Sequence, residues 1–341
     1  MHSLNRRRFL QLAGCAAGSP ALGALGAFGT LPALAAETFP ARPLALVVPY
    51  PAGGASDTSA RIFGESISKS VRQQVVVENY GGGTGLIGAN KVLAAPADGY
   101  TFFHGSINEV FLAPLLNPAA RYKPQDFMLA APISDANIVL MARNGLAADS
   151  LDKFLDLAKQ SKAKPLTYAT VGIDSIYHLM GDALAARLGV PLLHVPYKGG
   201  APALQGLAGG EVDFAILPYQ SSFDAMQQQG RLRILTCFSR SLPPALKHIP
   251  LISQSKQIPD FEYTIGGGYF VKAGTPAERV TVLRKAIGEA LAKPDILGKL
   301  EAEGRTVAKP IDSQAQADQA FDQYMTRVTQ LIRSVGRKTN A

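Results

Sequence analysis

The sequence predicts an α/β fold in two domains. Short β-rich runs alternate with helical patterns along the chain after residue 36, and this alternation is typical of α/β layering. The remaining 341 − 36 = 305 residues exceed one typical domain. Because no Pro/Ser-rich linker interrupts them, we expect the domains to be joined by strands that cross between them.

Residues 1–36 have the pattern of an export signal. Arg6, Arg7 and Arg8 form a basic head, and a small-residue apolar stretch follows over 12–34. The run Ala33-Leu34-Ala35 is a small-x-small cleavage pattern. We therefore expect a mature, periplasmic chain that starts at residue 36 or 37.

The export route is predicted from residues 5–11, which resemble a twin-arginine signal, with Gln11 where lysine is more usual. Repeated glycines and prolines in the apolar stretch argue against a membrane helix. Residues 12–15 also match a lipoprotein box ending at Cys15, but the apolar segment before Cys15 is too short for that processing.

Charge and cysteine content exclude several classes of protein. Lys and Arg exceed Asp and Glu by 34 − 26 = 8, or by 8 − 3 = 5 once the three signal arginines are removed. With no further basic run, we expect no nucleic-acid partner, whereas a small anionic ligand suits the mild positive charge. Cys237 is then alone in an apolar run, which excludes an internal disulfide and predicts a buried thiol.

The first half of the mature chain reads as three strands and two helices. Five apolar residues at 44–48 predict a strand buried on both faces. A Pro/Gly turn follows, and Ser56 and Asp57 are good N-caps for the next helix. The expected elements are strands at 44–48, 74–78 and 101–104, and helices at 58–70 and about 86–94.

The same rhythm returns after residue 138. Long helical patterns at 277–292 and 313–335 are expected to pack on the outside. Before them lie expected strands at 138–142, 166–171, 192–195, 212–217 and 232–238, and helices at 150–159, up to about 188, and from 201. No apolar run after the signal approaches the roughly 20 residues that span a bilayer, so we expect a soluble mature protein.

Glycines mark three strand–loop–helix junctions, at Gly53-Gly54, at Gly172 and at Gly199-Gly200. A helix N-terminus offers unpaired N–H groups and a positive dipole end, which suit a carboxylate or phosphate. Glycine there lets the backbone approach a ligand closely. Each junction alone is also compatible with an ordinary turn.

Residues 83–88 spell G-x-G-x-x-G, and Glu109 follows 21 residues beyond Gly88. This is the form of a dinucleotide fingerprint. Its helix has only about eight residues before Pro96, which is short for a Rossmann crossover, and an export signal disfavours a free nicotinamide cofactor. A twin-arginine-exported NAD(P)-dependent oxidoreductase is the alternative function.

The remaining chemistry-bearing residues give no catalytic pattern. His104, His178, His194 and His248 have no metal-ligand spacing, and no G-x-S-x-G elbow is present. We expect no enzyme activity, no cofactor and no metal.

The loop sequences resemble those of one family along essentially the whole mature chain. The matching segments are 47–57, 77–79 with 82–88, 96–101, 194–203, 210–213 and 273–276. They are similar to the substrate-binding proteins of tripartite tricarboxylate transporters, the Bug-type receptors. Several ordered matches are more specific than a lone glycine motif, and the fingerprint falls inside one of them.

The resemblance implies a two-lobed periplasmic-binding-protein (Venus flytrap, type II-like) fold with two crossing strands. Lobe 1 would comprise residues 37–138 plus 239–341, and lobe 2 residues 139–238. A ligand carboxylate would be held in the cleft, largely by backbone N–H groups and hydroxyls. Carried over to this chain, the binding residues are Tyr50, Ala52, Gly53, Gly54, Ser56, Asp57, Thr170, Gly172, Asp174, Ser175, Lys198 and Gly199.

The implied partners are a small organic carboxylate and the membrane permease subunits of a tripartite tricarboxylate-type system, with the receptor a monomer. Coupling to a sensor kinase instead of a permease stays open. Asp174 stands where the family usually has glycine, and Glu109 lies in another loop expected near the cleft. Asp174 would repel a polyanion, so we hypothesise a monoacid or a zwitterion, with helix capping by Asp174 as the alternative.

Overall fold

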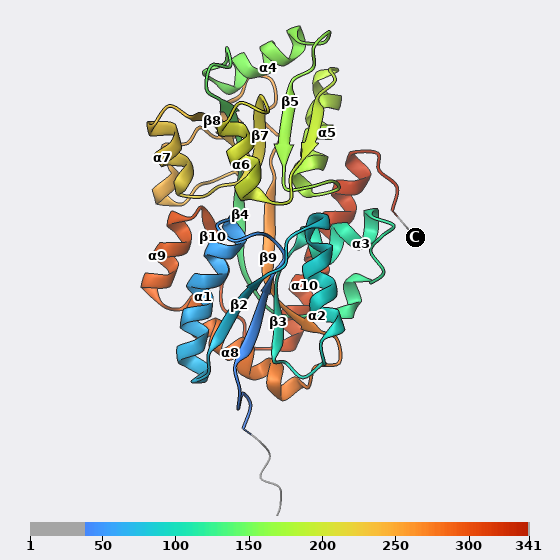
Figure 1. The fold of residues 1–341 in the computed structure, drawn as a ribbon, viewed down its shortest axis with the longest axis vertical. Coiled ribbons are helices and arrows are strands. Elements are labelled where there is room, and N and C mark those ends of the chain that lie inside the picture. Colours follow the sequence, from blue (N-terminus) through green and yellow to red (C-terminus); the bar gives the residue numbers. More distant parts are fainter. Residues whose placement is uncertain (1–37, 340–341) are drawn as a thin grey trace, which may run out of the picture. The chain divides into compact units, whose positions relative to one another are not determined.

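Two hydrogen-bonded sheets share one long strand, β4 (Phe127–Arg143) (Figure 1). The computed structural model describes residues 38–339, so the predicted export signal, its cleavage site and Cys15 lie outside the described residues. β4 pairs with β9 (Thr264–Lys272) up to Asn137, and with β7 (Phe214–Pro218) from Ile138 onward. The chain returns through residues 238–263, which lead from β8 (Leu232–Cys237) into β9.

The first sheet has a parallel part and an antiparallel part. β1 (Leu44–Val48) pairs in parallel with β2 (Val75–Asn79) and β3 (Thr101–Ser106), and β9 then runs antiparallel to β3. The short strand β10 (Arg305–Val307) pairs with β4. Both faces of β1 are buried, as its apolar run predicts: Leu46 and Val48 lie in one apolar cluster and Val47 in the other.

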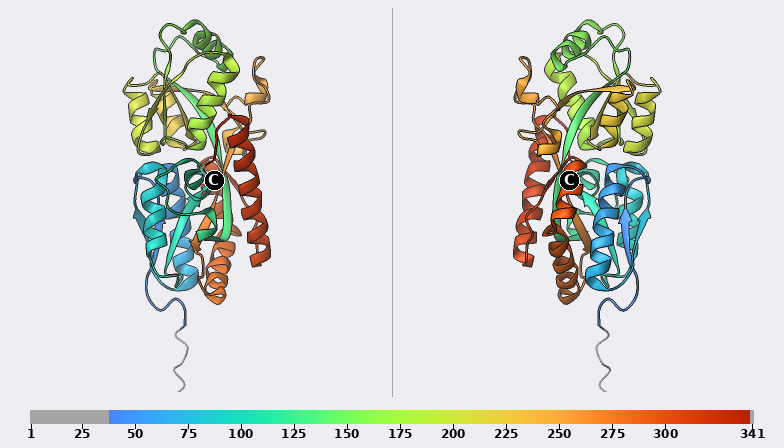
Figure 2. Two further views of the ribbon diagram at one scale, coloured as in Figure 1. Left: turned by 90° about the vertical axis from the view of Figure 1, so that its right-hand side faces the viewer. Right: turned by 90° about the vertical axis from the view of Figure 1, so that its left-hand side faces the viewer.

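Six helices accompany this first sheet. The apolar cluster behind β1 contains residues of α1 (Ala55–Val71), α8 (Ala277–Leu291) and α9 (Pro294–Ala302). The other cluster contains residues of α2 (Leu86–Ala94), α3 (Ala113–Leu116) and α10 (Gln314–Ser334). Figure 2 shows α10, in red, alongside β4, with which it makes direct contact.

The second sheet contains the later half of β4 with β7, β8, β5 (Thr167–Thr170) and β6 (Leu193–Pro196). It carries α4 (Leu151–Gln160), α5 (Ile176–Leu188), α6 (Gly200–Ala208) and α7 (Ser222–Gln228). Cys237, at the end of β8, is buried, as its apolar surroundings predict. The two-lobed α/β architecture is thus confirmed, while the division at residues 138/139 and 238/239 stays a prediction.

Several elements differ from the sequence-based expectations. β4 has 17 residues, of which only the last part was predicted. β9, β10, α7, α9 and a π-helix at Asn108–Leu112 were not predicted. The N-cap of α1 is Gly54 rather than Ser56 or Asp57, which lie in its first turn.

Within residues 38–339, no helix combines the length and the apolar character that crossing a membrane requires.

Candidate ligand-binding cavity

A cavity of about 40 Å³ lies where the two sheets meet. Elements of the first sheet supply most of its wall, and the second sheet supplies Val171, Tyr177, Gly200 and Pro218. The residues of the first sheet and its helices are Tyr50, Gly54, Ala55, Ser56, His104, Gly105, Ser106, Asn108, Ile133, Ser134, Ala136, Ile265, Gly267 and Arg305. Residues distant in sequence therefore share one small space lined by both polar and apolar groups.

The alternation of side chains along β4 and β10 separates several residues that line this cavity from their neighbours on the other face. Successive residues of a strand point to opposite faces. Ser134 and Ala136 of β4 line the cavity, whereas Asp135 and Asn137 line a hollow on the other face. Arg305 of β10 faces the cavity in the same way, and its neighbour Thr306 faces the hollow.

Two helix N-termini reach the cavity from opposite sheets. Gly54, Ala55 and Ser56 open α1, and Gly200 opens α6. Their first-turn N–H groups have no partner within the helix, and they lie at the positive end of the helix dipole. The arrangement therefore favours an anion between the sheets.

Asp57 shapes the first loop and is not among the residues that line the cavity. Its carboxylate accepts hydrogen bonds from Gly53 N at 3.0 Å, Asn79 Nδ2 at 3.0 Å and Arg61 Nε at 3.1 Å. Burial raises the pKa of Asp57, but the bonds from Arg61, Gly53 and Asn79 outweigh it and lower the pKa overall. Asp57 thus stays ionised and holds the Gly53 turn, where φ is +80°.

The second loop is held together by its own hydroxyls. Thr170 Oγ1 accepts from Gly172 N at 3.2 Å, and Ser175 Oγ donates to the Gly172 carbonyl at 2.8 Å. Gly172 has a φ of +146°, and a Cβ there would lie 2.4 Å from Thr84 Oγ1. Thr170, Gly172 and Ser175 are buried beside the cavity-lining Val171 but do not themselves line it.

Asp174 does not take the capping role that the sequence indicated. Ser175 is the N-cap of α5, and its Oγ accepts from His178 N. The Asp174 carboxylate lies 3.9 Å from both His178 Nδ1 and Arg337 Nη1, and Asp174 is not among the cavity-lining residues. The cap interpretation of Asp174 is therefore wrong, and the ligand-amine interpretation stays a prediction. Its φ of +57° explains why glycine suits this position.

The other predicted residues divide between the cavity and its surroundings. Of the twelve positions, Tyr50, Gly54 and Ser56 line the cavity. Ala52, Gly53 and Lys198 are exposed, and Gly199 is buried where a Cβ would lie 2.8 Å from Pro51 Cδ. The first and third loops thus touch each other directly.

Asn108 joins the two sheets and was missed by the sequence analysis. Its Oδ1 accepts from Ile176 N, the first N–H of α5, at 2.8 Å, and its Nδ2 donates to the Tyr50 hydroxyl at 3.4 Å. Asn108 is 1% exposed and begins the π-helix. Nothing in its local sequence marks a residue that caps a helix 68 positions later.

Three buried polar atoms in the cavity wall have no hydrogen-bond partner among the described residues: His104 Nδ1, Ser134 Oγ and Arg305 Nε. Burial lowers the pKa of His104 to about 3, with Arg305 adding to the effect and Asp57 opposing it. His104 is therefore neutral. In the sequence, His104 was a candidate only as a metal ligand, and neither Ser134 nor Arg305 carries a signal that predicts this position.

The glycines of the G-x-G-x-x-G run serve close packing. A Cβ on Gly85 would lie 2.2 Å from Glu109 Cγ, and one on Gly88 would lie 2.8 Å from Pro49 Cα. Glu109 is fully buried, and its Oε2 accepts from Ser106 N and Oγ at 2.7 Å each. Burial raises the pKa of Glu109. Glu109 is not among the cavity-lining residues, contrary to expectation.

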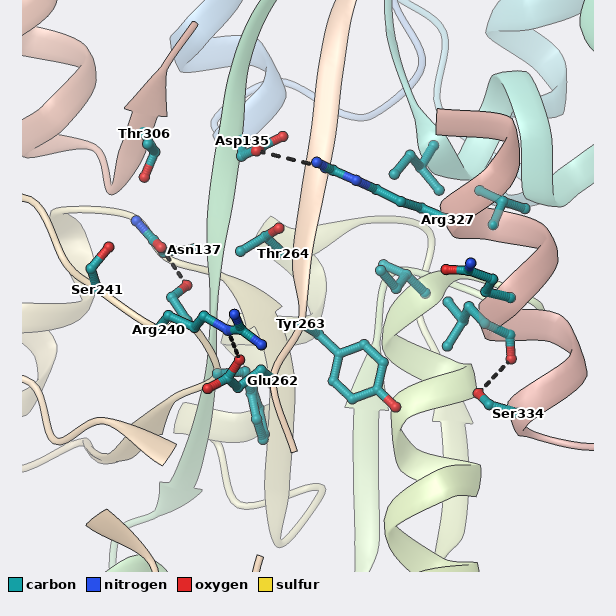
Figure 3. Close-up of a pocket in the computed structure, with 17 residues that line it drawn as sticks. Asp135, Asn137, Arg240, Ser241, Glu262, Tyr263, Thr264, Thr306, Arg327 and Ser334 are labelled. Atoms are coloured by element: carbon teal, nitrogen blue, oxygen red, sulfur yellow. Dashed lines mark hydrogen bonds and ion pairs between the residues drawn. The ribbon is translucent and has the colours of Figure 1, made fainter. Parts of the chain in front are cut away.

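A second, larger hollow of about 720 Å³ lies on the other face of β4 and β9 (Figure 3). Its charged residues are paired: Asp135 with Arg327 at 4.0 Å, and Arg240 with Glu262. Arg327 and Arg240 are 56% and 87% exposed. This hollow is open and charge-balanced, in contrast to the cavity.

Comparison with known proteins places the chain in a family. The model of the tripartite tricarboxylate transporter family receptor matches residues 59–337. A UPF0065 protein from the tcbD-tcbE intergenic region of Pseudomonas sp. strain P51 is 35% identical over 269 residues, which are 79% of this chain and 79% of that protein.

Two solved structures are similar over nearly their whole length. The periplasmic binding protein BugD has a TM-score of 0.80 at 29% identity, covering 88% of this chain and 99% of its own. The R. palustris protein Rpa4515, solved with adipate, has a TM-score of 0.81 at 28% identity, with the same coverage of 88% and 99%. With the two-sheet fold and the loops around the cavity, these matches show that the chain belongs to the family of tripartite tricarboxylate transporter receptors.

Proposed function

We propose that this chain is a periplasmic receptor that captures a small organic carboxylate between its two sheets and does no chemistry on it. The observation that carries the proposal is the cavity bounded by the N-termini of α1 and α6, which come from opposite sheets. Two positive helix ends can hold an anion without a salt bridge to a lysine. Membership of the receptor family and the adipate bound by Rpa4515 support the same class of ligand.

Ligand entry requires the loops around the cavity to separate. The cavity of about 40 Å³ holds little more than one water molecule. Contacts between elements of the two sheets close it: Thr84 Oγ1 donates to the Ile173 carbonyl at 2.7 Å, and Gln220 Nε2 donates to the Gly53 carbonyl at 3.3 Å. The receptor would open by breaking these contacts and would close again around its ligand.

The wider function belongs to the same proposal. A twin-arginine signal in residues 1–36 would export the chain, and the loaded monomer would deliver its ligand to the membrane permease subunits of a tripartite tricarboxylate-type system. The binding residues would be the cavity-lining members of the predicted set, Tyr50, Gly54 and Ser56, with Asn108 and Gly200 added. The hypothesis of a monoacid or zwitterionic ligand stays a prediction. His178 Nδ1 and Arg337 Nη1, each 3.9 Å from the Asp174 carboxylate, offer it partners other than a ligand amine.

Calorimetric titration of the purified mature chain tests this function. We would compare linear mono- and dicarboxylic acids with the primary amides of the same length and with NAD⁺. Binding of acids but not of amides, with the acid recovered unchanged, is the expected result. Binding of NAD⁺ and of no acid, or conversion of a bound acid, would contradict the proposal.

A further inference from the structure

Arg305 is a buried cation with no acidic partner in the part of the chain that the structure describes. It begins β10, opposite Ala136 of β4, and is only 7% exposed. Its Nη2 donates to the Ala55 carbonyl at 2.8 Å, while its Nε has no hydrogen-bond partner. Over residues 38–339, no carboxylate oxygen lies within 4.0 Å of its guanidinium nitrogens.

The groups around Arg305 do not balance its charge. His104 is neutral, and burial raises the pKa of the Tyr177 and Tyr269 hydroxyls, so both phenols are neutral as well. Burial lowers the pKa of Arg305 overall, and the Glu303 carboxylate opposes this only from beyond 4.0 Å, while it accepts hydrogen bonds from Ser221 N and Oγ. A buried charge left without a counter-charge is costly. The fold nevertheless keeps this one at the wall of the cavity.

The position of Arg305 in the cavity wall indicates that an acidic group of the ligand would neutralise its charge. Arg305, His104 and Ser134 all come from the first sheet, all line the cavity, and each has an unpartnered polar atom there. Tyr177 and the α6 N-terminus at Gly200 stand on the second-sheet side. Arg305 lies beside the first turn of α1, through its bond to the Ala55 carbonyl. An elongated ligand could therefore place one carboxylate at the α6 N-terminus and another acidic group at the guanidinium.

We propose that Arg305 binds a second acidic group of the ligand, so that this receptor selects dicarboxylates over monocarboxylates of equal length. The inference rests on the proposed function, since it assigns a second acidic group of the same ligand. A guanidinium donates charge-assisted hydrogen bonds to a carboxylate in a fixed geometry. A neutral methyl end would leave the buried charge without a partner.

The test uses calorimetric titration at about pH 7.5, where both carboxyl groups are ionised. The probes are succinate against butyrate, and adipate against hexanoate. Arg305→Met removes the charge and keeps an apolar side chain of similar length. Arg284→Met is the matched control: Arg284 is 4% exposed, donates to the Ala130 carbonyl at 2.9 Å, and does not line the cavity.

For the wild type and Arg284→Met we expect the diacid of at least one pair to bind about 10- to 100-fold more tightly than its monoacid. In Arg305→Met this preference should disappear while the monoacid affinity is retained. Equal binding of diacids and monoacids by the wild type, or an equal loss of both in Arg305→Met, would overturn the role of Arg305 but leave the receptor function standing. Failure of all acids to bind the wild type would overturn both proposals.

One probe needs no variant and covers the case in which Arg305→Met does not fold. The monoamide of adipic acid keeps the shape of adipate and loses one charge. We expect the wild type to bind it about 10- to 100-fold more weakly than adipate. Equal affinities for adipate and its monoamide would contradict the proposal.

Discussion

The cavity and the hollow lie on opposite faces of the same strands, β4 and β9, and they differ in whether their buried or exposed charges are paired. The cavity has about 40 Å³ and encloses Arg305, which has no acidic partner among the described residues. The hollow has about 720 Å³, and its arginines are exposed and paired with Asp135 and Glu262. By volume alone, the hollow would be chosen as the ligand site. The unpaired charge indicates the cavity instead, because there an acidic ligand would supply the counter-charge that Arg305 lacks.

The largest expected difference between the cavity and the hollow is in how the free energy of unfolding responds to a fall in pH. Unfolded histidine has a pKa of about 6.5, and that of His104 is held at about 3. Below pH 6.5 the unfolded chain therefore binds a proton that the folded chain rejects, so stability present above pH 6.5 is lost as the pH falls toward 3. At about 1.4 kcal/mol per pH unit, His104→Gln should reduce the loss of unfolding free energy between pH 7 and pH 4 by about 3 kcal/mol.

Urea unfolding at the two pH values measures this difference, with His248→Gln, at an exposed site, as the control.

In the hollow, the pH dependence of stability has the opposite sign. Burial raises the pKa of Asp135, and the smaller effect of Arg327 opposes it. The stability that Asp135 contributes is thus present at low pH and is lost as the pH rises through its folded pKa. Identical pH slopes for wild type and His104→Gln would show that His104 is not buried as described.

The next largest difference is expected when a larger side chain is introduced into the cavity or into the hollow. Ala136 is 1% exposed in the cavity wall, so Ala136→Leu should overpack it and lower the free energy of unfolding by about 1–3 kcal/mol. It should also weaken acid binding at least about 10-fold, since the cavity loses its free volume. Thr264→Leu, on the open hollow, should change either quantity little. Thermal unfolding and calorimetric titration give both numbers; a binding loss for Thr264→Leu alone would move the ligand site to the hollow.

Asn108→Ala tests the link between the two sheets. It leaves the Ile176 N–H at the start of α5 without its partner, which should lower the free energy of unfolding by about 1–2 kcal/mol. Asn144→Ala, at an exposed loop position, is the control and should cost less than about 0.5 kcal/mol. Equal effects of the two variants in chemical unfolding would mean that the Asn108 bond does not hold the sheets together.

The smallest effect is expected at Arg327. Its ion pair with Asp135 spans 4.0 Å and is half exposed, so Arg327→Met should lower the free energy of unfolding by less than about 1 kcal/mol. Arg305→Met, without ligand, should leave it unchanged or raise it, because a buried uncompensated charge is removed. A larger loss of stability for Arg305→Met than for Arg327→Met would show that the charge of Arg305 is compensated within the protein.

Much of the fold could be predicted from local patterns. The strand at 44–48 was placed to the residue, and the helix at 277–292 to within one, because continuous apolar runs and 3.6-residue periods mark them. β9 was missed because Gly266, Gly267 and Gly268 read as a turn. The first half of β4 was missed because Pro132, Ser134 and Asp135 interrupt its apolar pattern. Pairing with neighbouring strands overrides these local signals.

The site was less predictable, for a related reason. Tyr50, Gly54 and Ser56 lie in a loop between a recognisable strand and helix, and loops of this kind carry their own glycine and N-terminus signals. Arg305 stands in the charged run Glu301 to Arg305 and reads as solvent-exposed. Its burial depends on the pairing of β10 with β4, about 170 residues earlier in the chain, which no local pattern encodes.

The pairing of β10 with β4 also determines when the cavity wall can be completed during translation. β4 is made early, but its hydrogen-bonding partners β7, β8, β9 and β10 all follow it in the chain, β10 last. Contacts of such long sequence separation form slowly, because large loops must close first. The wall of the cavity is therefore unfinished until residue 305 has left the ribosome. A nascent chain in the cytoplasm would have no complete site with which to bind a metabolite, so recognition begins only when the protein is nearly whole.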